Sequence, residues 1–524
     1  MAEPWDTPLS PVNFLKRSSV AFADRPAIVD GDYRFTYSEM WDRAQRLAGA
    51  LIAHGVRPGD RVAVLAPNTR VLLEPHNGVP LAGAVLVALN QRLSANELSY
   101  IVNHAEARVL IYDHAWEEQA LAIAEQAPHD ITLIRADGPD DQYEPMIANA
   151  EPRQLRVTDE RDLISLNYTS GTTGQPKGVM YQHRGAYLNA LSNAFHAGLD
   201  TSSVFLWTLP MFHCNGWTFT WATTAAGATH LCMRELTAAN VWDAIRKEGV
   251  THFNGAPTVL TMIAHDDAAK GGPAPQKVEA ATGGAPPSPT ILAEMAELNI
   301  NVTHLYGLTE TYGPLTICQW QPQWNDLPRD EQARIRARQG VGMLASDHVR
   351  VLDIAGNDVP ADGATMGQVA ARGNNLMSGY YKDPEATANA MPGGWFRTGD
   401  VGVMHADGYI ELKDRSKDII ISGGENISSI EVEQAITRHP SVLEVAVIGE
   451  PDETWGEVPV AYVALKPDVR ATEEDIINHV KNTIARYKAP RRVVFTELPK
   501  TSTGKIQKFV LRDKAWAGHD RHIG

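Results

Sequence analysis

The segment YTSGTTGQPKGV (Tyr168–Val179) gathers hydroxyl side chains, glycines and one lysine within a short stretch. The residues before it, DLISLNY (162–168), are typical of a buried strand, and AYLNALSNAFHAGL (186–199) after it has helical spacing. We therefore expect a loop between a strand and a helix. Glycines let backbone N–H groups approach an anion closely, and a lysine adds positive charge. The predicted polyphosphate contacts are Thr169, Ser170, Gly171, Thr172, Thr173, Gly174 and Lys177.

The sequence gives less support to other functions for such a loop. A solvated connection would have a similar composition, because Ser, Thr and Gly favour turns for local reasons. A Walker A loop is excluded because Gly178, not Ser or Thr, follows Lys177. No G-x-G-x-x-G opens a helix, so a dinucleotide fold is not indicated. Ser502 and Lys505 form an S-x-x-K match, but no S-D-N or K-T-G accompanies it, which disfavours a serine acylase.

The chain outward from this loop predicts an α/β fold with two domains. Its 524 residues are too many for one core. Thr36 and Glu39 fit a capping box ahead of a helix, Gly55 ends that helix, and RVAVLAPN (61–68) follows as a buried strand. Helix-then-strand units continue past VLIYDH (109–114) and THFNGAPTVL (251–260), which favours mostly parallel sheets covered by helices. The stretch 270–289 is rich in Gly, Pro and Ala, and we expect a loop there.

The pattern changes after about residue 400. The expected elements are alternating residues over 408–424, a helix over 430–439, strands over 443–450 and 458–467, a helix over 472–487 and a strand over 491–498. This mix is typical of a small α+β domain with antiparallel strands. We expect a large domain over 1–413, a charged hinge over 414–419 and a small domain over 420–524.

Composition restricts the partners. Asp and Glu number 63 against 47 Lys and Arg, a formal charge of -16, which argues against nucleic acid or an anionic membrane surface. No apolar run is long enough to span a bilayer. Three scattered cysteines, Cys214, Cys232 and Cys318, fit a reducing compartment and have no zinc spacing. With no signal peptide at the start and no peroxisomal tripeptide at the end, we expect a cytoplasmic protein.

Further motifs identify the phosphate loop. They are MFHCNGW (211–217), TGGAPP (282–287), YGLTET (306–311), WFRTGD (395–400), DRSKDIIISGGENI (414–427) and PKTSTGKIQK (499–508). Together with the loop they closely resemble the signatures of the adenylate-forming superfamily, in the family's order and over essentially the whole chain. That superfamily contains acyl-CoA synthetases, peptide-synthetase adenylation domains and firefly luciferases.

The resemblance implies a two-step reaction with ATP, Mg²⁺ and coenzyme A. A carboxylate attacks the α-phosphate of ATP to give an acyl-adenylate and pyrophosphate, and a thiol then displaces AMP. By motif, Lys505 would contact the acid and the α-phosphate. Glu310 and Thr169 would hold the magnesium ion. The other residues implied to bind ATP are Gly283, Gly284, Ala285, Tyr306, Gly307, Thr309, Asp400 and Arg415.

The resemblance also implies a mobile small domain. Lys417 matches the family's hinge position, and rotation there would exchange Lys505 for the face that carries Ser422, Gly423 and Gly424, the expected pantetheine contacts. The residues implied to form the acid pocket are His213 (also a candidate catalytic residue), Asn215, Gly216, Trp217, Asn254, Gly255, Ala256 and Pro257. An indole in that wall would shorten the pocket.

The acid and its acceptor stay open. MFHCNGW and the segment 319–341 look most like the branch of plant acyl-activating enzymes and bacterial methylmercaptopropionate–CoA ligases, which implies a short- or medium-chain, branched or aromatic acid. Asn426 stands where some long-chain synthetases carry an aromatic gate. The alternatives are transfer to an amine or a carrier-protein thiol, and a nucleotide-binding regulator without catalysis. A homodimer is also left open.

Overall fold

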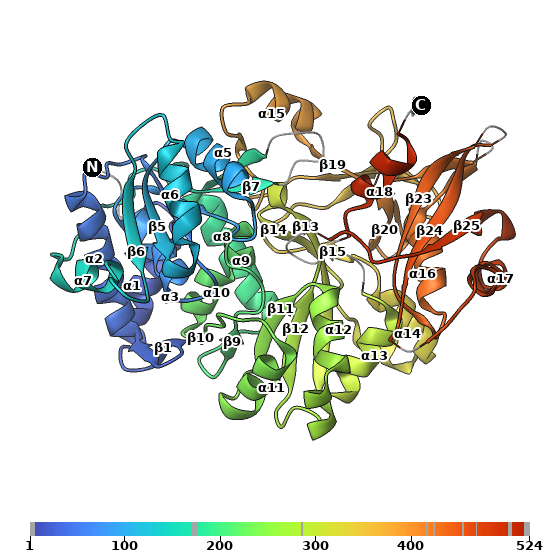
Figure 1. Ribbon diagram of the computed structural model, residues 1–524, viewed down its shortest axis with the longest axis horizontal. Coiled ribbons are helices and arrows are strands. Elements are labelled where there is room, and N and C mark those ends of the chain that lie inside the picture. The colour runs from blue at the N-terminus through green and yellow to red at the C-terminus, as the bar shows by residue number, and fades with distance from the viewer. Residues whose placement is uncertain are drawn as a thin grey trace.

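The computed structural model describes residues 6–517, except 170–175, 285–286, 416–417, 423–424, 453–454, 468 and 501–505. Within that part of the chain, four sheets form a large N-terminal unit and a smaller C-terminal one, at the left and right of Figure 1. The predicted fold class is therefore confirmed. None of the helices described is long and apolar enough to cross a membrane.

The first sheet has seven strands and is parallel at its centre, with antiparallel strands at one edge. Parallel strands buried on both faces read as continuous apolar runs, as in RVAVL of β3. The order is β18 (Gly379–Tyr380), β8 (Lys177–Gln182), β7 (Leu163–Thr169), β4 (Val85–Ala88), β3 (Arg61–Leu65), β5 (Ala107–Asp113) and β6 (Thr132–Ala136).

The second sheet has nine strands, and its parallel centre ends in antiparallel strands on both sides. Its parallel strands β11, β12 and β13 place their carboxyl ends side by side, and ligands of open α/β sheets bind at that edge. The order is β15 (Val341–Gly342), β14 (Gly313–Ile317), β13 (Ile300–Leu308), β12 (Val278–Thr282), β11 (His252–Gly255), β9 (Val204–Leu206), β10 (Thr229–Leu231), β1 (Pro26–Asp30) and β2 (Tyr33–Thr36).

Helices cover both sheets. The largest core joins apolar residues of the two sheets to α1 (Val12–Ala21), α2 (Tyr37–Ala53), α4 (Pro75–Leu81), α8 (His183–Ala197) and α10 (Phe219–Ala226). The outer faces are covered by α5 (Ala95–Ala105) and α6 (Glu117–Glu125) on the first sheet, and by α11 (Ala238–Lys247), α12 (Pro257–His265) and α13 (Pro289–Glu297) on the second. Shorter helices are α3 (Arg70–Leu73), α7 (Tyr143–Asn149), α9 (Cys214–Trp217), α14 (Arg329–Arg336) and α15 (Pro384–Ala390). The predicted capping box of Thr36 and Glu39 is confirmed at the start of α2.

An antiparallel sheet follows, with strands β16 (Arg350–Leu352), β17 (Gly367–Ala371), β19 (Phe396–Met404) and β20 (Ile410–Arg415). The C-terminal sheet consists of β22 (Glu425–Ile427), β21 (Ile420–Ser422), β24 (Gly456–Leu465), β23 (Val442–Asp452) and β25 (Arg492–Phe495). Helices α16 (Ser429–Thr437), α17 (Glu473–Thr483) and α18 (Lys508–Ala515) pack on it. The predicted hinge, 414–419, begins at the end of β20 and stops before β21.

Four expectations are corrected. Strand β7 is followed by a second, antiparallel strand, β8, and the helix begins only after β8, because KGVMYQ pairs with β7 first. The Gly/Pro-rich stretch 270–289 contains strand β12, whose VEAAT core is buried between β11 and β13. Helix α17 ends at Thr483, earlier than 487. Strand β25 runs parallel to β24, and α18 was not expected at all.

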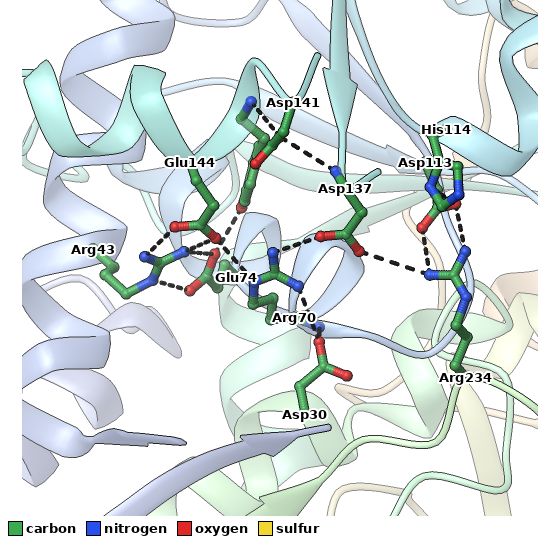
Figure 2. A network of polar contacts seen from close by, with 11 residues as sticks. Asp30, Arg43, Arg70, Glu74, Asp113, His114, Asp137, Asp141, Glu144 and Arg234 are labelled. Atoms are coloured by element: carbon green, nitrogen blue, oxygen red, sulfur yellow. Dashed lines mark hydrogen bonds and ion pairs between the residues drawn. The ribbon is translucent and has the colours of Figure 1, made fainter. Parts of the chain in front are cut away.

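A buried ion network connects the two large sheets (Figure 2). Arg70, whose side chain is only 2% exposed, bonds to Asp137 at 2.6 Å, to Glu144 at 2.9 Å and to Asp30 at 3.4 Å. Asp30 ends a strand of the second sheet, whereas Asp137 follows β6 of the first. Burial raises the pKa of Asp30 although Arg70 lies beside it. One cation thus holds carboxylates from both sheets.

Candidate active site

The phosphate loop begins and ends at a paired position. Thr169 is opposite Lys177 in the β7–β8 ladder, so the two predicted contacts that flank 170–174 lie side by side. Those five lie outside the described residues. The Nζ of Lys177 lies 4.9 Å from the ring centroid of Tyr380, on the neighbouring strand β18. Thr169 and Lys177 are therefore brought together, and Tyr380 lies next to them.

Glu310 approaches the same place from the second sheet. It is in the 3-10 turn η3 (Thr309–Thr311) that follows β13, and this turn packs against β7. The hydroxyl of Tyr380 donates to Glu310 Oε1 at 2.9 Å. Burial, and then the nearby Glu310 carboxylate, raises the pKa of Tyr380, so this phenol stays a donor. Tyr181 fixes the turn, because its hydroxyl donates to the Thr309 carbonyl at 2.6 Å.

The donors at this point fit Mg²⁺ that arrives with ATP. Mg²⁺ takes one or two protein oxygens beside phosphate oxygens and waters. Glu310 offers a carboxylate and Thr169 a hydroxyl from adjoining elements. In the described part of the chain no three His, Cys, Asp or Glu side chains gather as a metal site. We propose that Glu310 and Thr169 hold an ion shared with the phosphates.

Tyr380 yields a prediction. Tyr380→Phe removes the hydrogen bond that orients Glu310, and losing such a supporting bond typically costs about 10- to 100-fold in metal affinity or activity. We expect the Mg²⁺ concentration for half-maximal pyrophosphate exchange to rise by about tenfold. Tyr381→Phe, the same change at the next residue, is the control. An unchanged Mg²⁺ dependence in Tyr380→Phe would remove Tyr380 from the site.

The predicted nucleotide residues also meet. Tyr306, near the end of β13, donates from its hydroxyl to Asp400 Oδ2 at 2.6 Å, and Asp400 is paired with Arg415 across β19 and β20. The β13–β14 register shifts between Tyr306 and Gly307. A Cβ on Gly307 would lie 1.9 Å from the Gly313 carbonyl oxygen, so only glycine permits that approach. Such bulges redirect side chains beside active sites.

Predicted ATP contacts and predicted acid contacts lie along one edge of the second sheet. Gly283 follows β12 directly, and Gly284 has φ +85°, which favours glycine. Asn254 and Gly255 end β11, which is the parallel neighbour of β12. Ala256 and Pro257 then start α12. Ala285 lies outside the described residues.

The predicted acid wall is next to this edge. Trp217 is 7% exposed, and a Cβ on Gly283 would lie 3.1 Å from its Cη2. His213 is half-buried at the start of α9. Burial raises the pKa of the Cys214 thiol to about 12, which keeps it protonated and unreactive. The wall predicted for the acid therefore lies so close to a glycine predicted to bind ATP that no side chain would fit between them.

The C-terminal residues are placed only in part. Ser422 ends β21 and pairs with Glu425, while Gly423, Gly424, Lys417 and Lys505 lie outside the described residues. Lys500 and Ile506 form a bridge across the segment that contains Lys505. The roles predicted for these residues stay predictions.

The sequence pattern missed the tyrosines and amides that support this site. Tyr380, Tyr181 and Tyr312 come from separate strands and turns, and only the fold brings them to Glu310 and α9. Asn189 and Asn193 are buried on α8, where amides are unusual. Those polar residues within an apolar helix face were the available signal.

Comparison with known proteins identifies the family. The model of the AMP-binding enzymes matches residues 15–381, and the model of their C-terminal domain matches residues 431–505. The chain belongs to the AMP-binding enzymes. The predicted resemblance to adenylate-forming acyl-CoA synthetases is confirmed.

Relatives of this AMP-binding enzyme include acid–CoA ligases along its whole length. An acetate–CoA ligase of Humulus lupulus is 44% identical over 97% of this chain and 95% of its own. A peroxisomal benzoate–CoA ligase of Arabidopsis thaliana is 43% identical, with 98% and 94% covered. An anthranilate–CoA ligase solved in complex with anthranoyl-AMP superposes with a TM-score of 0.86 at 27% identity, covering 98% of this chain and 99% of that one.

Proposed function

We propose that this enzyme joins a short- or medium-chain, branched or aromatic carboxylic acid to coenzyme A. The chain is an AMP-forming acid–CoA ligase that uses ATP, Mg²⁺ and coenzyme A, as its full-length relatives are acid–CoA ligases. One observation supports the proposal most: a Cβ on Gly283, which is predicted to bind ATP, would lie 3.1 Å from the indole of Trp217, which is predicted to line the acid pocket. The acid and ATP would therefore bind next to each other, and such proximity supplies much of the rate of a two-substrate reaction.

The roles of the residues follow from their chemistry. Lys177 and the Thr169 hydroxyl would hold the phosphates at the β7–β8 connection, where a cation and hydroxyl donors suit an anion. The Asp400 carboxylate would accept hydrogen bonds from the ribose hydroxyls, with Tyr306 as its neighbour. Lys505 would bring an ammonium to the acid carboxylate and the α-phosphate. Mg²⁺, when bound, neutralises charge on the departing pyrophosphate.

Trp217 supports the limit on acid size. Its indole also faces Gly313, where a Cβ would lie 3.1 Å from Trp217 Cδ1. Glycine on both sides lets a large ring occupy the space that a longer acid would need.

Shortening Trp217 should lengthen the preferred acid. A methylene that fits or does not fit a pocket changes kcat/KM by about 10- to 200-fold. In Trp217→Ala we expect kcat/KM for octanoate relative to butyrate to rise by at least about tenfold, with Trp217→Phe between. The measurement is acyl-CoA formation over a series of straight-chain acids. An unchanged chain-length profile would contradict the assignment of Trp217 to the pocket.

The acceptor is the part of the proposal that needs its own experiment. Each acid that supports pyrophosphate release is incubated separately with coenzyme A, with an amine such as ethanolamine, and with pantetheine, which represents the thiol arm of a carrier protein. The products are identified by mass spectrometry. Acyl-CoA as the main product is expected. Amide formation that exceeds acyl-CoA formation would favour the amide-ligase alternative, and binding of ATP with no turnover would favour the regulator.

We also propose a reducing compartment such as the cytoplasm. All three cysteines are buried and free, which fits such a compartment. The names of some plant relatives place those proteins in peroxisomes, so fractionation of cells that express the tagged protein decides between the two.

A further inference from the structure

The acid wall contains a left-handed turn. Five consecutive residues have positive φ: Cys214 (50°), Asn215 (52°), Gly216 (59°), Trp217 (54°) and Thr218 (62°). L-residues visit this region as single residues and not as helical turns, because Cβ approaches the carbonyl oxygen. Strain of this kind persists only where the surroundings fix it, and it gathers at functional sites.

Asn193 of α8 fixes one end of the turn. Its Nδ2 donates to the Trp217 carbonyl at 2.8 Å and lies 2.9 Å from Thr218 Oγ1. Asn193 is 1% exposed, so these bonds form away from bulk water. In a buried position a lost hydrogen bond leaves the carbonyl without a partner, which makes this contact costly to remove.

Tyr312 fixes the middle of the turn. Its hydroxyl donates to Asn215 Oδ1 at 3.0 Å. Its ring stacks on Tyr181, with centroids 3.6 Å apart and planes inclined by 10°. Because Tyr181 also bonds to the Thr309 carbonyl, the turn is connected to the residue before Glu310.

Packing leaves the turn no room to shift. A Cβ on Gly216 would lie 2.4 Å from Trp207 Cζ3, so the backbone lies flat against a buried indole. On the other side, Trp217 lies against Gly283 and Gly313. The handedness of the turn therefore determines where the Trp217 indole points.

We propose that Asn193 and Tyr312 are positioning residues that set the acid specificity by holding the left-handed turn, and with it the indole of Trp217. The inference rests on the proposed function, since it assigns Trp217 to the acid pocket. Neither residue touches the acid. Together they keep the indole at the depth that excludes longer chains.

The test uses two variants and a control. Asn193→Leu keeps the volume and removes both hydrogen bonds, and Tyr312→Phe keeps the stack and removes one. Gln276→Leu is the control, because Gln276 donates to the carbonyls of Ile245 and Val250 at 2.9 and 2.7 Å in a different core. We expect kcat/KM for octanoate relative to butyrate to rise about tenfold in Asn193→Leu and less in Tyr312→Phe. The KM for ATP should stay unchanged in both, and Gln276→Leu should keep the wild-type profile.

Two further readouts separate positioning from general loosening. In the Trp217→Ala background, Asn193→Leu should add nothing to the change in chain-length preference, because both act through the same side chain. The amides of Trp217 and Thr218, which bond to His213 and Cys214 carbonyls, should exchange hydrogen faster in Asn193→Leu. They should exchange at the wild-type rate in Gln276→Leu.

Each outcome decides something. A wild-type chain-length profile in both Asn193→Leu and Tyr312→Phe would overturn the inference, even if their amides exchanged faster. Additive effects in the Trp217→Ala background would also overturn it. A wild-type chain that activates no acid would overturn the proposed function instead, and amide exchange would still show whether Asn193 holds the turn.

Discussion

Lys505→Ala should lower acid-dependent pyrophosphate exchange by about 10²–10³-fold, while acyl-CoA formation from supplied acyl-adenylate largely survives. That factor is typical for the loss of one donor that stabilises charge in a transition state. The ammonium would act where the acid carboxylate and the α-phosphate oxygens carry negative charge, and only the first half-reaction joins those groups. Both half-reactions are measured on the same preparation.

The described residues on either side of Lys505 are fixed to each other and to the C-terminal unit. Beside the Lys500–Ile506 bridge, the Gln507 amide donates to the Pro499 carbonyl at 2.8 Å, so the described residues before and after 501–505 are held together. Lys508 then donates to the Ser429 hydroxyl at 2.6 Å and pairs with the half-buried Glu433 at 2.7 Å.

Helix α18, which follows Lys505, also contacts the predicted hinge. Arg512 of α18 pairs with Asp418, and both side chains are at most 10% exposed. Asp418 directly follows Lys417. A rotation at the hinge would therefore move α18, and the residues that flank Lys505, together with Asp418.

Lys500→Ala is the matched control for Lys505. It removes the same charge from the same segment, but the Lys500 ammonium is 2.7 Å from Glu444 and is bound there. Adenylation should change little in that variant. A Lys505→Ala enzyme that loses both half-reactions equally would refute the assigned role.

Arg70→Met should be the most destabilising single change away from the site, by about 3–5 kcal/mol. The guanidinium is buried among Asp30, Asp137 and Glu144. Its loss leaves Asp30, whose charge burial already disfavours, without a cation, whereas Glu144 keeps Arg43 and Asp137 keeps Arg234. The Cζ atom of Arg70 also lies 3.7 Å from the centroid of the Tyr33 ring. The urea concentration at the midpoint of unfolding measures the effect.

Arg246→Met is the control for Arg70. Arg246 also lies over an aromatic ring, 4.7 Å from the Trp242 centroid, but it is exposed. We expect a change of less than about 1 kcal/mol there. Adding Asp30→Asn to Arg70→Met should restore part of the stability, because it removes the buried charge that has lost its cation. Equal midpoints for Arg70→Met and Arg246→Met would contradict the account of the network.

Helices and parallel strands were predicted well where capping residues or apolar runs within the element itself indicate them. The Thr36–Glu39 cap and the apolar run of β3 needed no distant partner. The β7–β8 hairpin was missed because KGVMYQ is short and precedes a stronger helical signal. Strand β12 was missed because Gly and Pro on both sides concealed VEAAT, which becomes a strand by pairing with β11 and β13.

The candidate site divides in the same way. Motifs predicted Glu310, Asp400 and Tyr306, and the fold joins the last two by a hydrogen bond of 2.6 Å. Tyr380 and Asn193 carry no motif, and they matter only through a partner far away in the sequence. Tertiary packing brings such pairs together, and no local pattern in a single sequence indicates which residues will meet.

The most direct test of the central claim is exchange of labelled pyrophosphate into ATP by the purified enzyme with Mg²⁺ and a panel of carboxylic acids. We predict exchange that depends on the acid, is strongest for short, branched or aromatic acids, and proceeds without coenzyme A. Absence of acid-dependent exchange across the whole panel would contradict the account.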